Sequence, residues 1–436
     1  MSRNILIRTY VTLAVILLAV SSGLGQSDAL KNDLSSSFKK VDVVSISVSR
    51  MVGGKQRLTF EQGGRAIDLV LEPHDLRAPG YRSIDNNVAG EATLDPLPVT
   101  TFKGVVSGIS GSAARINLNG SNNYSKNAGS GDFVIYRPED AVNNSTFACS
   151  SKLNEKIEMG RDIASSGISS VTPTLKKLKI ATEADAQYVT ALGGPAQANA
   201  EIMGILNVVE GLYNDQLVMD IRVVYQHTWS TPDPYSGANP EALVRSFQTY
   251  WNTNYPTTTV RRDTAHLFSG KSQVLSQGWA FIGVVCQNPS FAYGMSGYID
   301  WAPAKYLITA HEVGHNLGAN HVDAAQSCAN TLMNAQLTGS TPLSFCTYSQ
   351  SEVENFTNAN NSCLTVSSGC RFDFDGDSKA DISVFRPSTG AGYLSRSSLG
   401  FVGFQFGQAG DKTVAADYDG DGKTDAAVYR NGIWYR

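Results

Sequence analysis

His-Glu-Val-Gly-His-Asn-Leu-Gly-Ala-Asn-His occupies residues 311–321 and holds three of the chain's six histidines. On a helix, residues four apart lie about 40° apart around the axis and roughly 6 Å apart along it. His311 and His315 can therefore reach one ion. Gly318 is predicted to end the helix in a left-handed conformation, which turns the chain so that His321 reaches the same ion. Three imidazoles leave a tetrahedral zinc one open position, as in catalytic sites.

Glu312 directly follows one of these histidines and is the predicted proton acceptor. Its carboxylate can lie beside a zinc-bound water without being a ligand itself, which is the position of a general base. A chance match and a structural metal site are the alternatives. A catalytic zinc site is the stronger prediction, because the spaced histidines, the glutamate and the glycine occur together.

Residues 311–321 resemble the metzincin zinc peptidases, and His-Asn-Leu-Gly is most similar to the reprolysin or adamalysin branch. The resemblance covers about residues 175–366 and implies an α/β metzincin domain in which Glu312 is the base of peptide hydrolysis. It also implies a Met-turn below the zinc, for which Met333 follows His321 by twelve residues. Two features depart from the family pattern: Val322 separates His321 from Asp323, and no cysteine stands two residues before Met333.

The same resemblance implies how a protein or peptide substrate binds. In metzincins an extended peptide pairs with the edge strand above the zinc helix, so that main-chain hydrogen bonds provide affinity. The predicted edge strand contains Gly278, Trp279, Ala280 and Phe281. A buried central strand is the alternative interpretation. His227 and His266 lack ligand spacing and are interpreted as structural.

Six cysteines allow 15 full pairings, and sequence alone does not fix them. The family resemblance implies a Cys286–Cys346 disulfide, and elimination then pairs Cys328 with Cys363. Cys149 has two open interpretations. It is either a cysteine switch, whose thiolate occupies the open zinc position, or a disulfide partner of Cys370.

Export is predicted from the first 26 residues. Arg3 and Arg8 precede an uncharged run from Val11 to Val20, and small residues follow before Gln26. This pattern is typical of a signal peptide (residues 1–26) and predicts a secreted, extracellular protein. A single membrane anchor is the alternative, but the run is shorter than the ~20 residues that a spanning helix needs. No later segment is long enough to span a membrane.

The remaining chain divides by composition into a multidomain, mixed fold. Residues 27–164 alternate like a β-rich region and are predicted to be an inhibitory, separable propeptide. Residues 165–174 read as a polar linker, and residues 175–366 as the α/β catalytic domain. Within that domain we expect a helix through 202–213, another starting at Asn239-Pro240, and strands at 219–225, 264–268 and 278–285.

Residues 370–436 contain an acidic repeat. The aspartates of the first copy recur 44 residues later, and each copy precedes an apolar strand: Asp373, Asp375, Asp377 and Asp381, then Asp417, Asp419, Asp421 and Asp425. Carboxylates at positions 1, 3, 5 and 9 of a loop suit Ca²⁺. The loops resemble those of FG-GAP or VCBS repeats, which implies a β-rich, calcium-binding tail. Acidic turns without an ion are the alternative.

Composition separates the remaining function classes. The 42% apolar content excludes disorder, and a net charge of −4 argues against a nucleic-acid partner. The sequence predicts a secreted zinc endopeptidase made as a zymogen, with a tail that can bind an extracellular surface partner. The rival is a calcium-dependent surface-binding or adhesion protein with an inactive peptidase domain. Glu312 favours the enzyme, because a binding module needs no base.

Overall fold

The computed structural model describes residues 14–15, 47–51, 54–62, 65–107, 114–117, 135–136, 146–149, 175–300, 303–367, 372–375, 380–416, 418, 423–430 and 433–436. Several predictions fall outside the described residues. They are the signal peptide other than residues 14–15, the linker at 165–174, Cys370, Asp377, Asp417, Asp419 and Asp421. No helix in the described ranges is long and apolar enough to cross a membrane.

The chain forms two compact units. The first contains residues 1–164 and 178–364, and the second contains residues 165–177 and 365–436. The predicted propeptide region and most of the predicted catalytic domain therefore share one unit. The domain boundaries from the sequence stay a prediction.

The N-terminal region is β-rich where it is described. Seven of its strands form one sheet, in the order β2-β3-β4-β7-β8-β1-β9. This sheet encloses a small core of its own, which includes Leu58, Leu69, Leu71 and Phe102. The strands are β1 (Ala14–Val15), β2 (Ser47–Arg50), β3 (Gln56–Gln62), β4 (Arg65–Pro73), β7 (Thr101–Val106), β8 (Ala114–Asn117) and β9 (Ile135–Tyr136).

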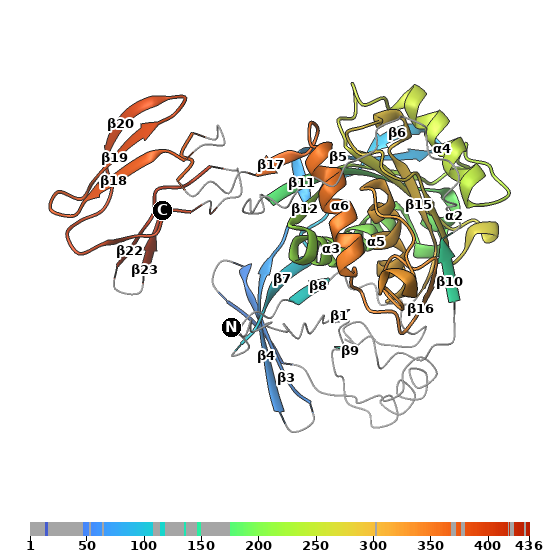
Figure 1. Ribbon diagram of the computed structural model, residues 1–436, viewed down its shortest axis with the longest axis horizontal. Coiled ribbons are helices and arrows are strands. Elements are labelled where there is room, and N and C mark those ends of the chain that lie inside the picture. The colour runs from blue at the N-terminus through green and yellow to red at the C-terminus, as the bar shows by residue number, and fades with distance from the viewer. Residues whose placement is uncertain are drawn as a thin grey trace. The chain divides into compact units, whose positions relative to one another are not determined.

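A second sheet combines strands from both regions. Its order in the described residues is β16-β10-β14-β15-β13-β11-β12-β5-β6. The N-terminal region contributes β5 (Arg77–Asn87), β6 (Gly90–Thr93) and β10 (Thr146–Cys149). The later strands are β11 (Leu175–Ala184), β12 (Met219–Trp229), β13 (Thr264–Ser269), β14 (Gln277–Ala280), β15 (Tyr293–Gly297) and β16 (Gln336–Thr338). In Figure 1, the blue strands β5 and β6 lie beside the green β12, whereas β7 and β8 lie next to helix α3.

The α-helices of the described residues all come from the second half of this unit. They are α2 (Ala186–Leu192), α3 (Pro195–Leu217), α4 (Pro240–Asn254), α5 (Ala304–Asn316) and α6 (Thr347–Ala359). Short 3-10 turns are η3 (Ser272–Val274), η4 (Pro289–Phe291) and η5 (Ala324–Gln326). Mixed α/β architecture was predicted for this region and is what the structure contains.

Local sequence signals explain where these elements begin and end. The predicted start of α4 is confirmed: the Asn239 side chain accepts a hydrogen bond from the Ala242 N–H at 2.9 Å, and Pro240 is the first helical residue. The predicted strand at 278–285 is too long. Strand β14 ends at Ala280, because the N–H groups of Gly283, Val284 and Val285 donate to the last carbonyls of α5.

Both sequence-based disulfide pairings are wrong. The structure pairs Cys286 with Cys363 and Cys328 with Cys346. The Cα atoms are 5.1 Å and 5.6 Å apart, which is within the range that a disulfide requires. The first bond links the loop after β14 to the segment after α6, and the second closes the loop that carries Met333. Elimination failed because its starting pair came from the family and not from this chain.

The second unit contains short antiparallel sheets. The strands are β17 (Thr365–Ser367), which pairs with Leu175–Lys177, then β18 (Ile382–Arg386), β19 (Ala391–Arg396), β20 (Gly400–Gln405), β21 (Lys412–Thr413), β22 (Val428–Arg430) and β23 (Ile433–Tyr435). The predicted apolar strand after the first acidic loop is β18. The one after the second acidic loop, predicted at residues 426–429, is β22, which begins at Val428.

Candidate metal centre

Helix α5 places two of the three predicted ligands. His311 and His315 are fully buried on it, and Gly318 follows with φ of 94°, the left-handed conformation expected from the sequence. A side chain at Gly318 would also collide with Phe356, since a Cβ there would lie 2.6 Å from Cγ of that ring. Both constraints select glycine at the turn that brings His321 back toward the helix.

Backbone carbonyls fix the orientation of both helical imidazoles. His311 Nδ1 donates to the Leu332 carbonyl at 2.6 Å, and His315 Nδ1 donates to the Ala319 carbonyl at 2.7 Å. A carbonyl can only accept, so each Nδ1 carries the proton and each Nε2 keeps its lone pair. This arrangement is how proteins orient histidine ligands.

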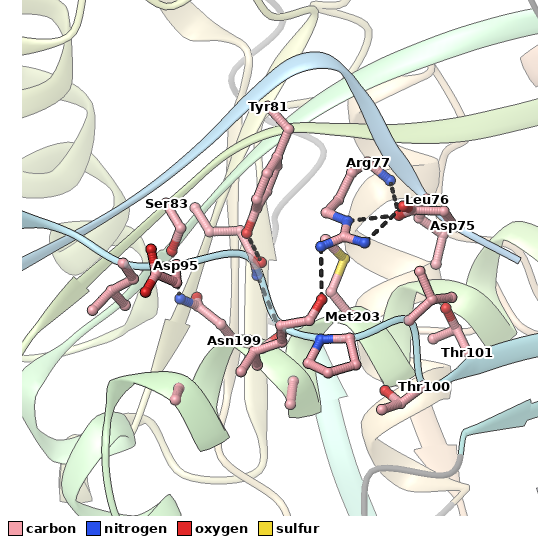
Figure 2. A pocket seen from close by; sticks show the side chains of 17 residues that line it. Asp75, Leu76, Arg77, Tyr81, Ser83, Asp95, Thr100, Thr101, Asn199 and Met203 are labelled. Carbon is pink, nitrogen blue, oxygen red and sulfur yellow. Dashed lines mark hydrogen bonds and ion pairs between the residues drawn. The ribbon is translucent and has the colours of Figure 1, made fainter.

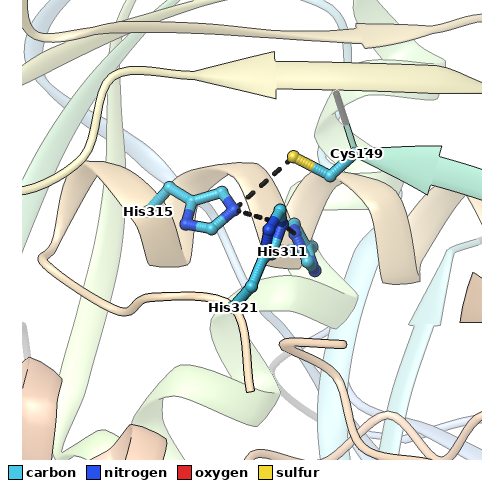
Figure 3. Close-up of side chains that lie close together, drawn as sticks. All are labelled: Cys149, His311, His315 and His321. Carbon is cyan, nitrogen blue, oxygen red and sulfur yellow. Dashed lines mark hydrogen bonds between the residues drawn. The ribbon is translucent and has the colours of Figure 1, made fainter. Parts of the chain in front are cut away.

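The three Nε2 atoms converge (Figure 3). His321 Nε2 lies 3.2 Å from His311 Nε2 and 3.1 Å from His315 Nε2. Nitrogens that share a tetrahedral zinc at 2.0 to 2.1 Å would be about 3.3 Å apart. The cluster therefore has nearly the dimensions that a zinc ion requires. The chemistry of the donors also fits, because neutral imidazole is a common zinc ligand.

Burial keeps these imidazoles neutral. It lowers the pKa of His311 to about 3, with a further contribution from the neighbouring His321. The pKa values of His315 and His321 are also lowered, mainly by burial. All three rings are consequently available as lone-pair donors at neutral pH.

Met333 lies beneath the cluster, against the zinc helix. A Cβ at Gly314 would be 3.0 Å from Met333 Sδ, so the methionine packs directly on the helix backbone. The first departure from the family pattern, the extra Val322 between His321 and Asp323, is accommodated locally. Val322 N–H donates to the Met333 carbonyl at 3.1 Å, and the Asp323 side chain accepts from Ala325 N–H at the start of η5.

Glu312 lies between the helix and strand β14. Its side chain is fully buried, and its Oε1 atom has no hydrogen-bond partner among the described residues. Burial raises the pKa of this carboxyl well above its ordinary value, although a hydrogen bond from Cys149 opposes the shift. Gly278 makes room for the carboxylate, because a Cβ there would lie 2.2 Å from Oε1. Gly278 therefore faces Glu312 and not a pocket for a substrate side chain.

Cys149 reaches the cluster from the N-terminal region. Its Sγ lies 3.5 Å from His315 Nε2 and 3.5 Å from Glu312 Oε2. The thiol and the three imidazoles together form a set whose ligand atoms all lie within 4.8 Å of one another. Cys149 is buried and is not in a disulfide, which contradicts the alternative pairing with Cys370.

Cys149 lies on strand β10, which is a neighbour of β14, the strand that was predicted to bind substrate. Strand β10 pairs in parallel with β14, with Cys149 opposite Gly278, and antiparallel with β16. Trp279 points to the opposite face from Gly278 and stacks edge-on against Phe281, 4.6 Å between ring centroids. Ala280 is buried, and Phe281 follows the end of the strand. Of the four predicted edge residues, only Gly278 is paired with β10, and Trp279, Ala280 and Phe281 lie beyond the paired residues.

Sequence reasoning missed Phe147 and the two carbonyls that orient the histidines. Phe147 is buried in the main core. It lies two residues before Cys149 on β10, so the two side chains are on the same face of the strand. The alternation of Phe147 and Cys149 around Ala148 was an available signal for a strand. The carbonyl acceptors carry no side-chain signal at all.

The acidic loops of the second unit repeat in structure as well as in sequence. Phe374 N–H donates to Asp381 at 2.7 Å, and the equivalent Tyr418 N–H donates to Asp425 at 2.9 Å. Asp373, Asp375 and Asp381 place carboxylate oxygens within 4.8 Å of one another. The first loop is therefore a candidate cation site. The second cannot be compared fully, because three of its aspartates lie outside the described residues.

The comparisons with known proteins agree with this geometry. Residues 183–367 match the reprolysin (M12B) family of zinc metalloproteases. The human disintegrin and metalloproteinase domain-containing protein 9 is 28% identical over 205 residues, which cover 44% of this chain and 24% of that protein. The zinc metalloproteinase-disintegrin-like brevilysin H2a of Gloydius brevicauda is 26% identical over 190 residues, 41% of this chain and 43% of the relative. The chain thus spans less than half the length of these relatives.

Solved structures give a weaker similarity. Metalloproteinase-II from Bacteroides fragilis is 14% identical, with a TM-score of 0.37, over 75% of this chain and 94% of that one. A chain described as the structure of a chaperone-substrate complex has a TM-score of 0.28 and 16% identity, over 35% of this chain and 25% of that one. The similarity to reprolysin metalloproteases is therefore a similarity in sequence, over residues 183–367.

The ligand assignment predicts metal content. The purified protein should contain about one zinc per chain, and His321→Ala should lose most of it, because two imidazoles bind zinc more weakly than three. Metal analysis by mass spectrometry after dialysis measures this. His266→Asn is the matched control: that histidine is buried beside Ser296, outside the cluster, and its replacement should leave the zinc in place. Equal zinc in wild type and His321→Ala would contradict the assignment.

Proposed function

We propose that this protein is a zinc-dependent endopeptidase. The convergence of His311, His315 and His321, with Glu312 beside them, carries the proposal. The match of residues 183–367 to a zinc metalloprotease family supports it. The proposed substrates are proteins or peptides, and the predicted signal peptide favours action outside the cell.

The residues divide the chemistry between them. Bound zinc would supply Lewis acidity, which polarises the scissile carbonyl and lowers the pKa of water. Glu312 Oε2 takes a proton from the attacking water and transfers it to the nitrogen of the leaving amine. Gly278 leaves Oε1 the space it occupies. Leu332 and Ala319 hold the imidazoles in one tautomer and orientation throughout.

Substrate would bind where β10 now lies. Without β10, strand β14 is an edge with unpaired N–H and C=O groups, and an extended peptide can pair with it. The peptide would pass directly over Gly278 and the Glu312 carboxylate. β10 therefore excludes substrate as long as it stays in the sheet.

Latency follows from the same arrangement. The Cys149 thiolate is proposed as a fourth zinc ligand, which would exclude the catalytic water. The support is its position 3.5 Å from His315 Nε2 on a strand that pairs with β14 and β16. The protein would then be made as a zymogen, which becomes active when β10 leaves.

The tail has a separate, structural role in this proposal. Asp373, Asp375 and Asp381 would bind Ca²⁺, and the second acidic loop would do the same. The repeated hydrogen bonds of the two loops support a pair of FG-GAP-like or VCBS-like units. The tail is proposed to bind a partner on an extracellular surface.

Glu312→Gln should retain zinc and lose at least about 10² in turnover of a small peptide, the lower end of what a general base contributes. Turnover is measured with a quenched fluorescent peptide on the activated enzyme, and zinc by mass spectrometry. Glu354→Gln is the matched control, since Glu354 is exposed on α6. Unchanged cleavage by Glu312→Gln would rule out the proposed mechanism.

Cys149→Ser should cleave peptides without processing, because a hydroxyl is a far weaker zinc ligand than a thiolate and β10, no longer held at the metal, should leave the sheet. A thiol reagent should activate the wild-type precursor and leave Cys149→Ser unchanged. The readout is peptide cleavage by the uncut chain, verified by gel. Cys370→Ser is the control and should stay latent. A latent Cys149→Ser would show that β10 blocks the site without help from the thiol.

Calcium should stabilise the tail without affecting turnover. The clustered carboxylates repel one another until an ion binds, and a hundredfold excess of Ca²⁺ over Kd would add about 2.7 kcal/mol. A chelator that spares zinc should lower the Tm of the tail, measured by calorimetry. Asp373→Asn should weaken this response, because only the second acidic loop would keep all of its carboxylates. Asp411→Ala, which removes an ion pair with Arg430, should lower the Tm and keep the response. A Tm that ignores calcium in wild type would refute the calcium site.

A further inference from the structure

Where it is described, the N-terminal region contacts the rest of its unit at two places of very different extent. One is β10 at the metal cluster. The other is a broad interface formed by the described residues between 47 and 117, which we term the N-terminal body. The difference between these two interfaces determines which part separates when the chain is cut.

Strand β5 of the N-terminal body extends the main sheet at β12. The two strands pair in parallel in continuous register from Tyr225 opposite Arg82 to Trp229 opposite Asn86. Further backbone hydrogen bonds lengthen the ladder at both ends: Val223 N–H donates to Leu76 O, and Ser230 N–H donates to Asn86 O. Leu76 is buried in the same core cluster as α3 and β12. The N-terminal body thus supplies both backbone pairing and core packing.

Helix α3 is shaped to fit the body's other sheet. The Asn207 side-chain amide donates to the carbonyls of Phe102 and Ile116, at 3.3 and 3.2 Å. At Gly204, a Cβ would lie 1.9 Å from Nδ2 of Asn117, so the helix and β8 approach closely. This fit depends on the absence of a side chain on the helix.

A buried ionic cluster joins the same surfaces. Glu210 on α3 is 1% exposed, and its Oε2 lies 2.7 Å from Arg115 and 3.3 Å from His74. Burial opposes ionisation, but contact with His74 and the charge of Arg115 lower the pKa of Glu210 to about 2. Glu210 is therefore an anion matched to a cation of the N-terminal body across the physiological pH range.

Neutral polar groups are matched across the interface too. Tyr81 OH donates to Gln226 Oε1 at 2.6 Å, and Asn199 Nδ2 donates to Ser83 Oγ at 2.9 Å. Figure 2 shows these residues around a cavity between β5 and α3, with a volume of about 50 Å³. A cavity of that size holds only a few water molecules. Apart from this cavity, the polar groups of the N-terminal body that are named above have hydrogen-bond partners on α3 and β12, as groups inside one domain do.

In the described residues, the backbone pairing of β10 is much shorter than that of β5. Strand β10 has four residues, two in register with β14 and three with β16. Phe147 and Cys149 are its buried side chains. A short strand can open locally, whereas an extensive, polar-matched interface opens only with the unit that contains it.

From this contrast, we infer that the N-terminal body is a permanent subunit of the folded enzyme, and that activation releases β10 alone. After cleavage of the chain, the body remains bound to α3 and β12 without a covalent link. The partner of this surface is thus the chain's own N-terminal fragment. The sequence analysis predicted that the whole N-terminal region separates. This inference differs, because only β10 is released.

Hydrogen exchange on the intact, uncut protein provides the first test. Amides of β10 should exchange at least about tenfold faster than those of β5 and β12, which should exchange together. Mass spectrometry of peptic peptides that cover 77–87, 146–149 and 219–229 measures the rates. Equal rates for β5 and β10, or faster exchange of β5, would overturn the inference.

Cleavage provides the second test, and it needs no peptidase activity. A recognition sequence for a site-specific protease is placed between residues 165 and 174, and the cut protein is run on size exclusion. The two fragments should elute together, and separate elution would overturn the inference. Failure of the proposed peptidase function would leave this result unaffected.

A helix substitution tests the surface itself. Gly204→Leu should favour helix formation in α3 while it collides with Asn117, so the cut fragments should separate. Glu354→Leu, on the exposed face of α6, is the matched control and should leave them together. Circular dichroism of each uncut variant verifies the fold. Cut fragments of a folded Gly204→Leu that stay together would show that this surface does not hold the body.

Discussion

The turn at Gly318 is the constraint on which the metal centre depends. Two histidines on one helix can only contribute from one side, and a third must come from residues beyond the helix end. The left-handed φ of 94° and the close ring of Phe356 both require glycine there. The turn also leaves the carbonyl of Ala319 free to accept from His315. One residue without a side chain thus sets both the third ligand and the orientation of the second.

The sequence predicted what is encoded within a few residues. The spacing of His311 and His315, the turn at Gly318 and the cap at Asn239 are all local, and the structure contains each of them. It did not predict what depends on distant segments. The disulfide partners were wrong because pairing depends on three-dimensional proximity, and Cys286 and Cys363 are 77 residues apart. Likewise, no local pattern reveals that Cys149 lies opposite Gly278, because that register exists only between strands that are far apart in sequence.

The main sheet shows how one chain can both complete and block a site. Its N-terminal region inserts β10 between β14 and β16 and adds β5 outside β12. Both additions satisfy the hydrogen-bonding groups of strands that would otherwise be edges. Their positions differ in consequence. In the strand order, β15, β13 and β11 separate β12 from β14, and β14 lies against Glu312. In the proposed mechanism, the same backbone pairing is therefore architectural at β12 and obstructive at β14.

The Cys328–Cys346 disulfide has a consequence for where the protein can mature. It closes the loop that contains Leu332, and the Leu332 carbonyl is the acceptor that orients His311. Such bonds form in oxidising compartments and are reduced in the cytosol. A chain kept among cellular reductants would lack this bond, so the closed form of the loop that orients His311 depends on thiol oxidation.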